Sequence, residues 1–321
     1  MKTYYVTTAI DYVNGNPHIG HAYEKLIADL LARWHRFLGE DVVFSVGTDE
    51  HGQKNQEAAD KRNISAQEFV DEQSSKFKEM YKSLKLSNDV FVRTTDEKHK
   101  TFVQDLVKKV NDNGDIYKGE YEGKYCVGCE SYKTEKELED GNCLIHQKPV
   151  QVRKEQTYFF KQSKYQDQIK KWITDGAIFP ESRKNEILNR LEEPLQDLAI
   201  TRLKENLTWG IDFPLDDGHV IYVWFDALPN YLSLLSDEQL NSHWPANAHV
   251  IGKDIMWFHA VIWPAILISA GYNLPEKLLV HGFINDAKGH KMSKSIGNVI
   301  DPYKILKLYG LDALRFFTYS A

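Results

Sequence analysis

The sequence predicts an α/β protein built on a parallel, doubly wound sheet. Two observations support this fold class. Short apolar strands alternate with helical patterns over the first hundred or so residues, and the same alternation resumes after about residue 216. Such alternation is typical of parallel sheets whose two faces are covered by helices. Between the two stretches the chain becomes aromatic and turn-rich, so we predict a Rossmann-type fold interrupted by an inserted domain.

In the first half, the elements are indicated by strand composition and by helix-start signals. Tyr4–Thr8 and Val42–Val46 are rich in β-branched and aromatic residues, which predicts two buried strands. Ser65–Glu68 and Thr94–Glu97 each have the pattern of a capping box that begins a helix. A helix between the two strands is predicted by an apolar stripe made of Leu26, Ile27, Leu30, Leu31, Trp34 and Leu38.

In the second half, the same signals return. Three further strands are predicted at Val220–Trp224, Ala248–Ile251 and Leu278–Val280. Asp254–Gly271 is a mostly apolar helical stretch that Pro264 should kink, because proline lacks the N–H that a helix interior requires. Asp301–Ala321 has a helical pattern, and two helices are expected in the insertion, near 163–175 and 181–195.

Length and composition set the broad class. The chain has 321 residues, 42% of them hydrophobic, which predicts two or three domains. It has no charged-then-apolar leader and no apolar run of about 20 residues, so we expect a cytoplasmic protein without membrane contact. Its net charge of −6 gives no overall attraction to nucleic acid, and an RNA partner is neither indicated nor excluded. The predicted divisions are 1–115, an insertion at 116–215, 216–272 and 273–321.

All three cysteines lie in one part of the insertion. Cys126 and Cys129 are followed thirteen residues later by Cys143 and His146, which supplies four ligands in the spacing of a zinc knuckle. Four protein ligands leave no open position for a reactive water, so the predicted zinc is structural. The knuckle should span about 123–150, and the alternative is a set of cysteines without a metal.

Two histidines follow a predicted turn. Asn14–Pro17 predicts that turn, so His18 and His21 lie where it becomes a helix. A helix N-terminus offers unpaired N–H groups and the positive end of a dipole, and Gly20 lets a nucleotide approach the backbone. The pattern indicates a phosphate site. The alternatives are ordinary polar residues of a first helical turn or a chance metal pair.

A basic loop lies near the other end of the sequence. Between Gly289 and Gly297 it carries two lysines and two serines: Lys291, Ser293, Lys294 and Ser295. Two ammonium groups on a glycine-bounded loop suit a clamp on a triphosphate, where positioning and charge neutralisation do most of the catalytic work. The alternative is a solvated basic surface loop.

Taken in order on an α/β background, the histidine and lysine segments resemble the paired ATP signatures of class I aminoacyl-tRNA synthetases. Four further segments are similar to the methionyl-tRNA synthetase family: Thr8–Gly15, Gly47–Gly52, Tyr222–Ala227 and Gly252–His259. The similarity runs through the whole chain, and the single knuckle resembles the one-zinc bacterial or organellar type. The resemblance implies a ligase that activates methionine with ATP and transfers it to tRNA(Met).

The resemblance also implies roles for individual residues. Asp49 would bind the substrate ammonium with help from the backbone of Ile10. The methionine pocket would be formed by Tyr12, Trp224, Ala227, Leu228, Tyr231, Ile255, Phe258 and His259. Aromatic rings suit a thioether, since sulfur packs favourably at ring edges. Without the resemblance, Asp49 would be interpreted as a solvated turn residue and the aromatic residues as core.

For ATP, the resemblance implies an adenosine site made by Asn14, Gly20, Glu24, Gly252 and Asp254. His18 and His21 would contact the phosphates, Lys291 and Lys294 the leaving pyrophosphate, with Ser293 and Ser295 on the same loop, and Mg²⁺ would accompany the triphosphate. Arg202 resembles a family arginine near the active site, with a surface arginine as the alternative.

The family usually continues into a helical anticodon-binding domain, whereas this sequence ends at Ala321. We therefore expect adenylate synthesis to persist and efficient tRNA charging to require that domain. Two other hypotheses remain open at this point. One is a synthetase-like paralogue that passes the adenylate to a different acceptor, and the other is a nonenzymatic RNA-binding scaffold.

Overall fold

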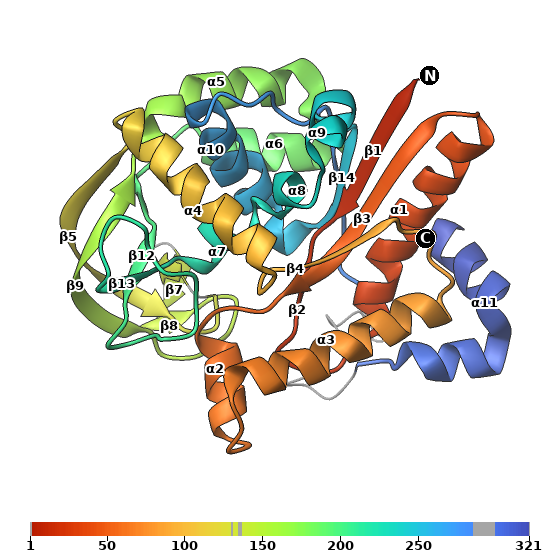
Figure 1. Cartoon of the computed structure of the whole chain (residues 1–321), viewed down its shortest axis with the longest axis horizontal. Helices are drawn as coiled ribbons and strands as arrows, with labels where there is room; N and C mark the ends of the chain where they lie inside the picture. Colours follow the sequence, from red (N-terminus) through yellow and green to blue (C-terminus); the bar gives the residue numbers. More distant parts are fainter. Residues whose placement is uncertain (1, 130, 134–136, 285–298, 321) are drawn as a thin grey trace.

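The computed structural model describes residues 2–129, 131–133, 137–284 and 299–320, and its centre is a seven-stranded sheet (Figure 1). The strand order is β10-β15-β14-β1-β3-β2, and β4 also pairs with β3. All these pairings are parallel. The strands are β1 (Thr3–Thr8), β2 (Asp11–Tyr12), β3 (Asp41–Asp49), β4 (Val90–Arg93), β10 (Ile178–Phe179), β14 (Ala248–Gly252) and β15 (Leu278–His281). The predicted doubly wound parallel sheet is confirmed.

The chain winds in opposite directions from β1. It leaves β1 toward β3 and β4, and later returns to β14 and β15 on the other side. The direction of winding therefore changes between β1 and β14. In open α/β sheets, ligands bind at such a point, outside the carboxyl ends of the strands.

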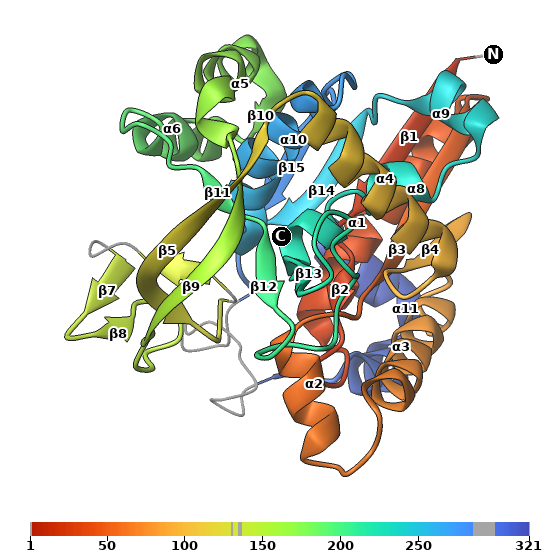
Figure 2. The ribbon, with the colours of Figure 1, turned by 60° about the vertical axis from the view of Figure 1, so that its left-hand side comes forward.

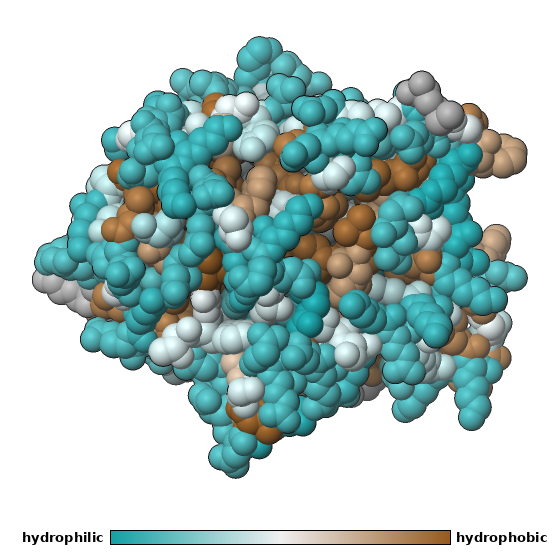
Figure 3. Space-filling model, in the orientation of Figure 1, coloured by the Kyte–Doolittle hydropathy of each residue, from teal (hydrophilic) through white to brown (hydrophobic). Residues whose placement is uncertain are grey.

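Helices cover both faces of the sheet. One core joins α1, α3 and α11 to the sheet, and a second is formed mainly by α4, α5, α6 and α10 with the ends of β14 and β15. Hydrophilic residues cover most of the face shown in Figure 3, with apolar residues gathered toward its middle. The helices are α1 (Ile19–Phe37), α2 (Gln53–Asp60), α3 (Ala66–Ser83), α4 (Glu97–Asp112), α5 (Gln166–Trp172), α6 (Glu181–Arg190), α7 (Val223–Ala227), α8 (Asn230–Ser233), α9 (Asp237–His243), α10 (Trp263–Ser269) and α11 (Pro302–Ser320).

The inserted region contains a separate antiparallel sheet in the order β11-β9-β5-β6. Its two long strands form a curved ribbon beside the main sheet (Figure 2). Strand bounds here are β5 (Ile116–Cys126), β6 (Ser131–Lys133), β7 (Leu138–Glu139), β8 (Asn142–Cys143), β9 (Gln151–Phe160), β11 (Leu198–Ala199), β12 (Thr201–Leu203) and β13 (His219–Ile221). Ile178–Phe179 pairs with β15 in the main sheet, so part of 116–215 returns to it. The division at these boundaries remains a proposal.

Three local predictions need correction. Val223 and Trp224 begin α7 rather than ending a strand, and β13 pairs with β12 in a two-stranded sheet outside the main sheet. The N-cap of α4 is Asp96, because the Thr94 hydroxyl instead accepts the N–H of Glu50. The helix was expected to kink at Pro264. The structure instead has a π-helical segment at Phe258–Ile262, and Pro264 lies in the first turn of the helix that follows.

The helix predicted by the apolar stripe exists, but its buried face overlaps that stripe only in part, at Leu26, Ile27 and Leu31. Trp34 and Leu38 are about half exposed, at 54% and 52%. Lys25 and Asp29, by contrast, are fully buried on α1. The apolar stripe therefore predicted the helix and part of its buried face, Leu26 with Ile27 and Leu31, but not the exposure of its last turn.

Candidate active site and metal site

His18 and His21 cap α1 reciprocally. Nδ1 of His18 accepts the N–H of Gly20 at 3.1 Å, and Nδ1 of His21 accepts the N–H of His18 at 3.0 Å. The rings stack with centroids 3.7 Å apart. A neutral imidazole whose Nδ1 accepts carries its proton on Nε2. The capping geometry thus assigns both histidines the tautomer that donates from Nε2 at a helix N-terminus, where an anion is favoured.

Several predicted residues lie at the carboxyl ends of neighbouring strands. Ile10 follows β1, Asp49 ends β3, and Gly252 ends β14. Tyr12 is in register with Asp49, and Gly252 is in register with His281. The topology therefore brings the predicted ammonium-binding and adenosine-binding residues to one edge of the sheet. Asp49 is 7% exposed, and a buried carboxylate is an expected partner for a bound ammonium group.

The aromatic residues predicted for methionine form a contiguous cluster. Trp224 stacks on Phe258 with centroids 3.6 Å apart and planes at 6°, and His259 meets Trp224 edge-on at 6.3 Å. The α7 helix explains this arrangement. Because residues three and four apart share a helical face, Trp224, Ala227 and Leu228 are presented together, which the predicted strand would not have done.

Tyr231 and His259 form the buried end of this cluster. Nδ1 of His259 lies 3.0 Å from the carbonyl of Ile255, to which it donates, so Nε2 accepts the Tyr231 hydroxyl at 2.7 Å. Burial lowers the pKa of His259 to about 4. His259 is therefore neutral at physiological pH. The buried end of the aromatic cluster carries no charge, which suits an apolar thioether.

Glu24 belongs to a buried network of charges. Its carboxylate accepts from Lys25 at 2.9 Å and from Nε2 of His281 at 3.3 Å. Nδ1 of His281 donates to the carbonyl of Gly282 at 2.8 Å, so with both nitrogens donating the ring is an imidazolium. Burial opposes this charge, but the ion pair with Glu24 raises the pKa of His281 overall. Asn14 and Asp254, also predicted for ATP, are exposed near this edge.

Asp226 links the amino-acid side of the site to α4. Its carboxylate is fully buried on α7. It accepts a hydrogen bond from Nδ1 of His51 at 2.7 Å and another from Nε2 of His99 at 2.9 Å. Burial acts against ionisation of Asp226, but the two histidines lower its pKa overall. His51 lies two residues after Asp49, so this bridge fixes the end of β3 against α7.

Arg202, for which a surface position was the alternative, is buried at 5% exposure. Its guanidinium lies over the rings of Tyr222 at 4.6 Å and Tyr125 at 5.3 Å, and donates to the carbonyl of Thr201 at 2.7 Å. Arg202 therefore joins the inserted sheet to the segment that leads into α7.

The structure brings the four predicted metal ligands together. The ligand atoms of Cys126, Cys129, Cys143 and His146 all lie within 4.8 Å of one another. Cys129 Sγ is 3.6 Å from Cys143 Sγ and 3.3 Å from His146 Nδ1. Tetrahedral zinc bonds of about 2.3 Å to sulfur and 2.1 Å to nitrogen place such atoms roughly 3.6 to 3.8 Å apart. The donor set and spacing fit a metal ion.

Gly128 makes this approach possible. A Cβ at Gly128 would lie 2.5 Å from Cγ of His146, which no side chain tolerates.

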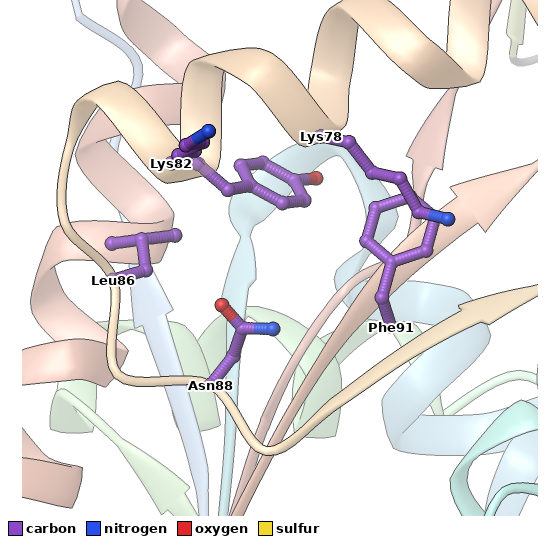
Figure 4. A pocket seen from close by; sticks show the side chains of 6 residues that line it. Lys78, Lys82, Leu86, Asn88 and Phe91 are labelled. Carbon is purple, nitrogen blue, oxygen red and sulfur yellow. The ribbon is translucent and has the colours of Figure 1, made fainter.

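The predicted residues Lys291, Ser293, Lys294 and Ser295 lie outside the described residues. The described part of the chain also has a cavity of about 170 Å³ between α3 and β4 (Figure 4) and another of about 430 Å³ between α4, α8 and α9. Neither is lined by a residue predicted to bind substrate.

Sequence reasoning missed the buried polar residues behind the site. Asp11 lies within the segment Thr8–Gly15 but was given no role, Lys25 and Tyr81 carry no recognisable motif, and a lysine on a helix is ordinarily assigned to the surface. One signal was available: Ala22, Lys25, Leu26 and Asp29 repeat at the spacing of a single helical face. A charged pair within such a face predicts a buried ionic network.

Three features together define a class I aminoacyl-tRNA synthetase catalytic domain. They are the parallel doubly wound sheet, the helix N-terminus capped by two histidines at its switch point, and the inserted antiparallel sheet with its metal-ligand cluster. The family model described as tRNA synthetases class I (M) matches residues 4–143 and 133–321. The chain belongs to that family.

Relatives and solved structures agree with this assignment. The methionine–tRNA ligase of Thermotoga maritima is 48% identical over 98% of this chain and 51% of its own length, and that of Nostoc sp. is 46% identical over 98% and 61%. The chain thus spans about half the length of most of the curated relatives it matches. Mycobacterium tuberculosis methionyl-tRNA synthetase in complex with methionyl-adenylate has a TM-score of 0.93 at 41% identity, covering 99% of this chain and 64% of that one. The apo form has a TM-score of 0.82 at 38% identity, covering 99% and 61%.

Within the described ranges, no helix has both the length and the apolar character needed to cross a membrane.

Proposed function

We propose that this chain activates L-methionine with ATP, forming methionyl-adenylate and pyrophosphate. The observation that carries the proposal is the TM-score of 0.93 to a synthetase holding methionyl-adenylate, over 99% of this chain. The relatives named methionine–tRNA ligase support the same reaction. They favour it over a paralogue with another acceptor and over a nonenzymatic scaffold.

In the proposed reaction, a carboxylate oxygen of methionine attacks the α-phosphorus of ATP. The bond from that phosphorus to the bridging oxygen breaks, and pyrophosphate leaves with the electron pair. The protein supplies no nucleophile, so its contribution is orientation and charge stabilisation. Asp49 and the backbone of Ile10 hold the ammonium group, while Nε2–H of His18 and His21 donates to the phosphate oxygens.

We propose that the thioether lies against the cluster of Trp224, Phe258 and Tyr231, with Tyr12, Ala227, Leu228, Ile255 and His259 completing the pocket. The neutral, buried end of this pocket at Tyr231 and His259 supports the assignment, because a cationic side chain would lose its hydration there. An unbranched thioether fits between ring edges better than a branched or charged side chain.

For ATP, we propose that Asn14, Gly20, Glu24, Gly252 and Asp254 surround adenosine. A Cβ at Gly252 would lie 2.7 Å from a carboxylate oxygen of Asp254, so glycine leaves room there. Lys291 and Lys294 would neutralise charge on the pyrophosphate, and the hydroxyls of Ser293 and Ser295 would donate hydrogen bonds to it. Mg²⁺ bound with ATP would share that charge.

We propose zinc as the ion of the Cys126, Cys129, Cys143 and His146 cluster, with a structural role. The transfer of methionine to tRNA(Met) is the second step of the proposed reaction. The cytoplasmic location remains a prediction from the sequence.

Direct detection of the intermediate tests this proposal. The purified chain is incubated with labelled methionine, ATP, Mg²⁺ and pyrophosphatase, and the product is separated by chromatography. We expect labelled methionyl-adenylate bound to the protein. Its absence at millimolar methionine would contradict the proposal. A parallel reaction with tRNA(Met) tests the transfer step separately.

A further inference from the structure

Lys25 is fully buried in the first half of α1, and all three of its N–H bonds have partners. Nζ donates to the carbonyl of Ala9 at 2.9 Å, to Asp11 at 2.6 Å and to Glu24 at 2.9 Å. These acceptors come from three places: the segment after β1, the start of β2 and the preceding residue of α1. One ammonium group therefore fixes three elements that meet at the switch point.

The amino-acid side of the site depends on two of these contacts. Ala9 and Asp11 flank Ile10, whose backbone we assigned to the substrate ammonium group. Asp11 is further held by a short hydrogen bond from the hydroxyl of Tyr81 on α3. With both flanking residues tied to Lys25, the backbone at Ile10 has little freedom to move.

The nucleotide side depends on the third contact. Glu24 accepts from Lys25 through one oxygen and from His281 through the other. His281 ends β15 and is in register with Gly252, which we assigned to adenosine. Lys25 and His281 thereby hold the Glu24 carboxylate from two sides.

The network is balanced in charge. It contains two carboxylates, Asp11 and Glu24, and two cations, Lys25 and His281. Burial of Lys25 disfavours its charge, yet the two carboxylates raise its pKa overall. Removing the ammonium group would leave Asp11 without a cationic partner and Glu24 with His281 alone, so the geometry of both subsites would change together.

We propose that Lys25 is a positioning residue that sets the geometry of the methionine and adenosine subsites at once. The inference rests on the proposed function and adds a coupling between its two substrates. A displacement of about 1 Å at a reacting centre is enough to cost a large factor in rate.

The test compares KM for methionine and for ATP in pyrophosphate exchange, together with urea unfolding. Lys25→Met keeps the length of the side chain and removes its charge, and we expect both KM values to rise about tenfold or more. Tyr81→Phe removes only the outer contact to Asp11, so KM for methionine should rise and KM for ATP should stay unchanged.

Two further variants separate positioning from folding. Asp11→Asn combined with Lys25→Met removes one anion with the cation and leaves the Glu24 pair with His281, so it should fold while KM for methionine remains raised. Asp115→Asn is the control for stability, since Asp115 is equally buried and accepts from Lys164 and Ser269 outside the site. It should unfold more easily with unchanged KM values.

If both Lys25 variants have KM values within twofold of those of the unchanged chain, the inference about Lys25 is overturned and the proposed function stands. If the unchanged chain itself shows no exchange with methionine, the proposed function fails and the inference fails with it. Raised KM values in the Lys25 variants, with unchanged values in Asp115→Asn, support the positioning role.

Discussion

His18 and His21 each accept a backbone N–H through Nδ1 within one reciprocal capping box at the start of α1. The same hydrogen bonds that begin the helix also decide which nitrogen of each ring is left to donate. Helix initiation and phosphate recognition are therefore coupled in these two side chains.

His21→Ala should lower the rate of methionine-dependent pyrophosphate exchange by about 100-fold or more, the usual effect of removing one donor to a charged transition state. Because both rings donate as neutral imidazoles, the rate should not decline between pH 7 and 8.5. His35→Ala, near the other end of α1, is the matched control and should exchange at the normal rate. A rate for His21→Ala within threefold of the unchanged chain would exclude the phosphate role.

Trp224→Ala should raise KM for methionine by about tenfold or more and leave KM for ATP unchanged. The indole is partly buried and stacks on Phe258 in the proposed thioether pocket, so its truncation removes contact with the thioether but none with ATP. Trp34→Ala provides the control, because Trp34 is 54% exposed on α1. Equal effects on the two KM values would place Trp224 outside the methionine pocket.

Acid should destabilise the fold through His259. Burial lowers its pKa to about 4 in the folded protein, whereas an unfolded histidine has a pKa near 6.5. Between these values the unfolded chain binds more protons, so the free energy of unfolding falls as the pH falls from about 6.5 to 4, by up to about 3 kcal/mol. Burial lowers the pKa of His249 as well, in the same direction.

Urea unfolding at several pH values checks this expectation. His259→Gln keeps a polar side chain but cannot take up the proton, so its stability should depend less steeply on pH. An identical slope for the variant and the unchanged chain would show that His259 does not contribute.

The metal site should hold one zinc per chain, measured by elemental analysis of protein purified without added metal. Cys143→Ser removes a fully buried ligand and should lower the zinc content and the stability of the inserted sheet. Asp140→Asn, in the same hairpin but outside the ligand set, should retain full zinc. Protein with no zinc, and with unchanged stability after chelation, would contradict the assignment.

The fold was largely predictable from the sequence because its strands are strongly apolar and its helices begin with clear signals. Ser65 caps α3 as its pattern predicts, with its side chain accepting the N–H of Glu68. The strand predicted to end at Val223 and Trp224 was wrong. β-branched and aromatic residues favour strands in isolation, whereas packing in the core holds these two in a short helix. Propensity describes single residues, and tertiary contacts decided this segment.

The site was predictable only as far as its residues carry a motif. The histidines, Asp49 and the metal ligands have recognisable spacing. Lys25 with Asp11, and Asp226 with His51 and His99, are distant in sequence and meet only after the sheet forms. Their roles depend on burial, which a local pattern cannot report for a charged side chain.

The central claim is that this site activates methionine. Pyrophosphate exchange measured with each of the amino acids in turn tests it most directly. Exchange should depend on methionine, with the other amino acids giving only slow turnover at the same concentration. Exchange that depends on a different amino acid, with none above background for methionine, would contradict the account.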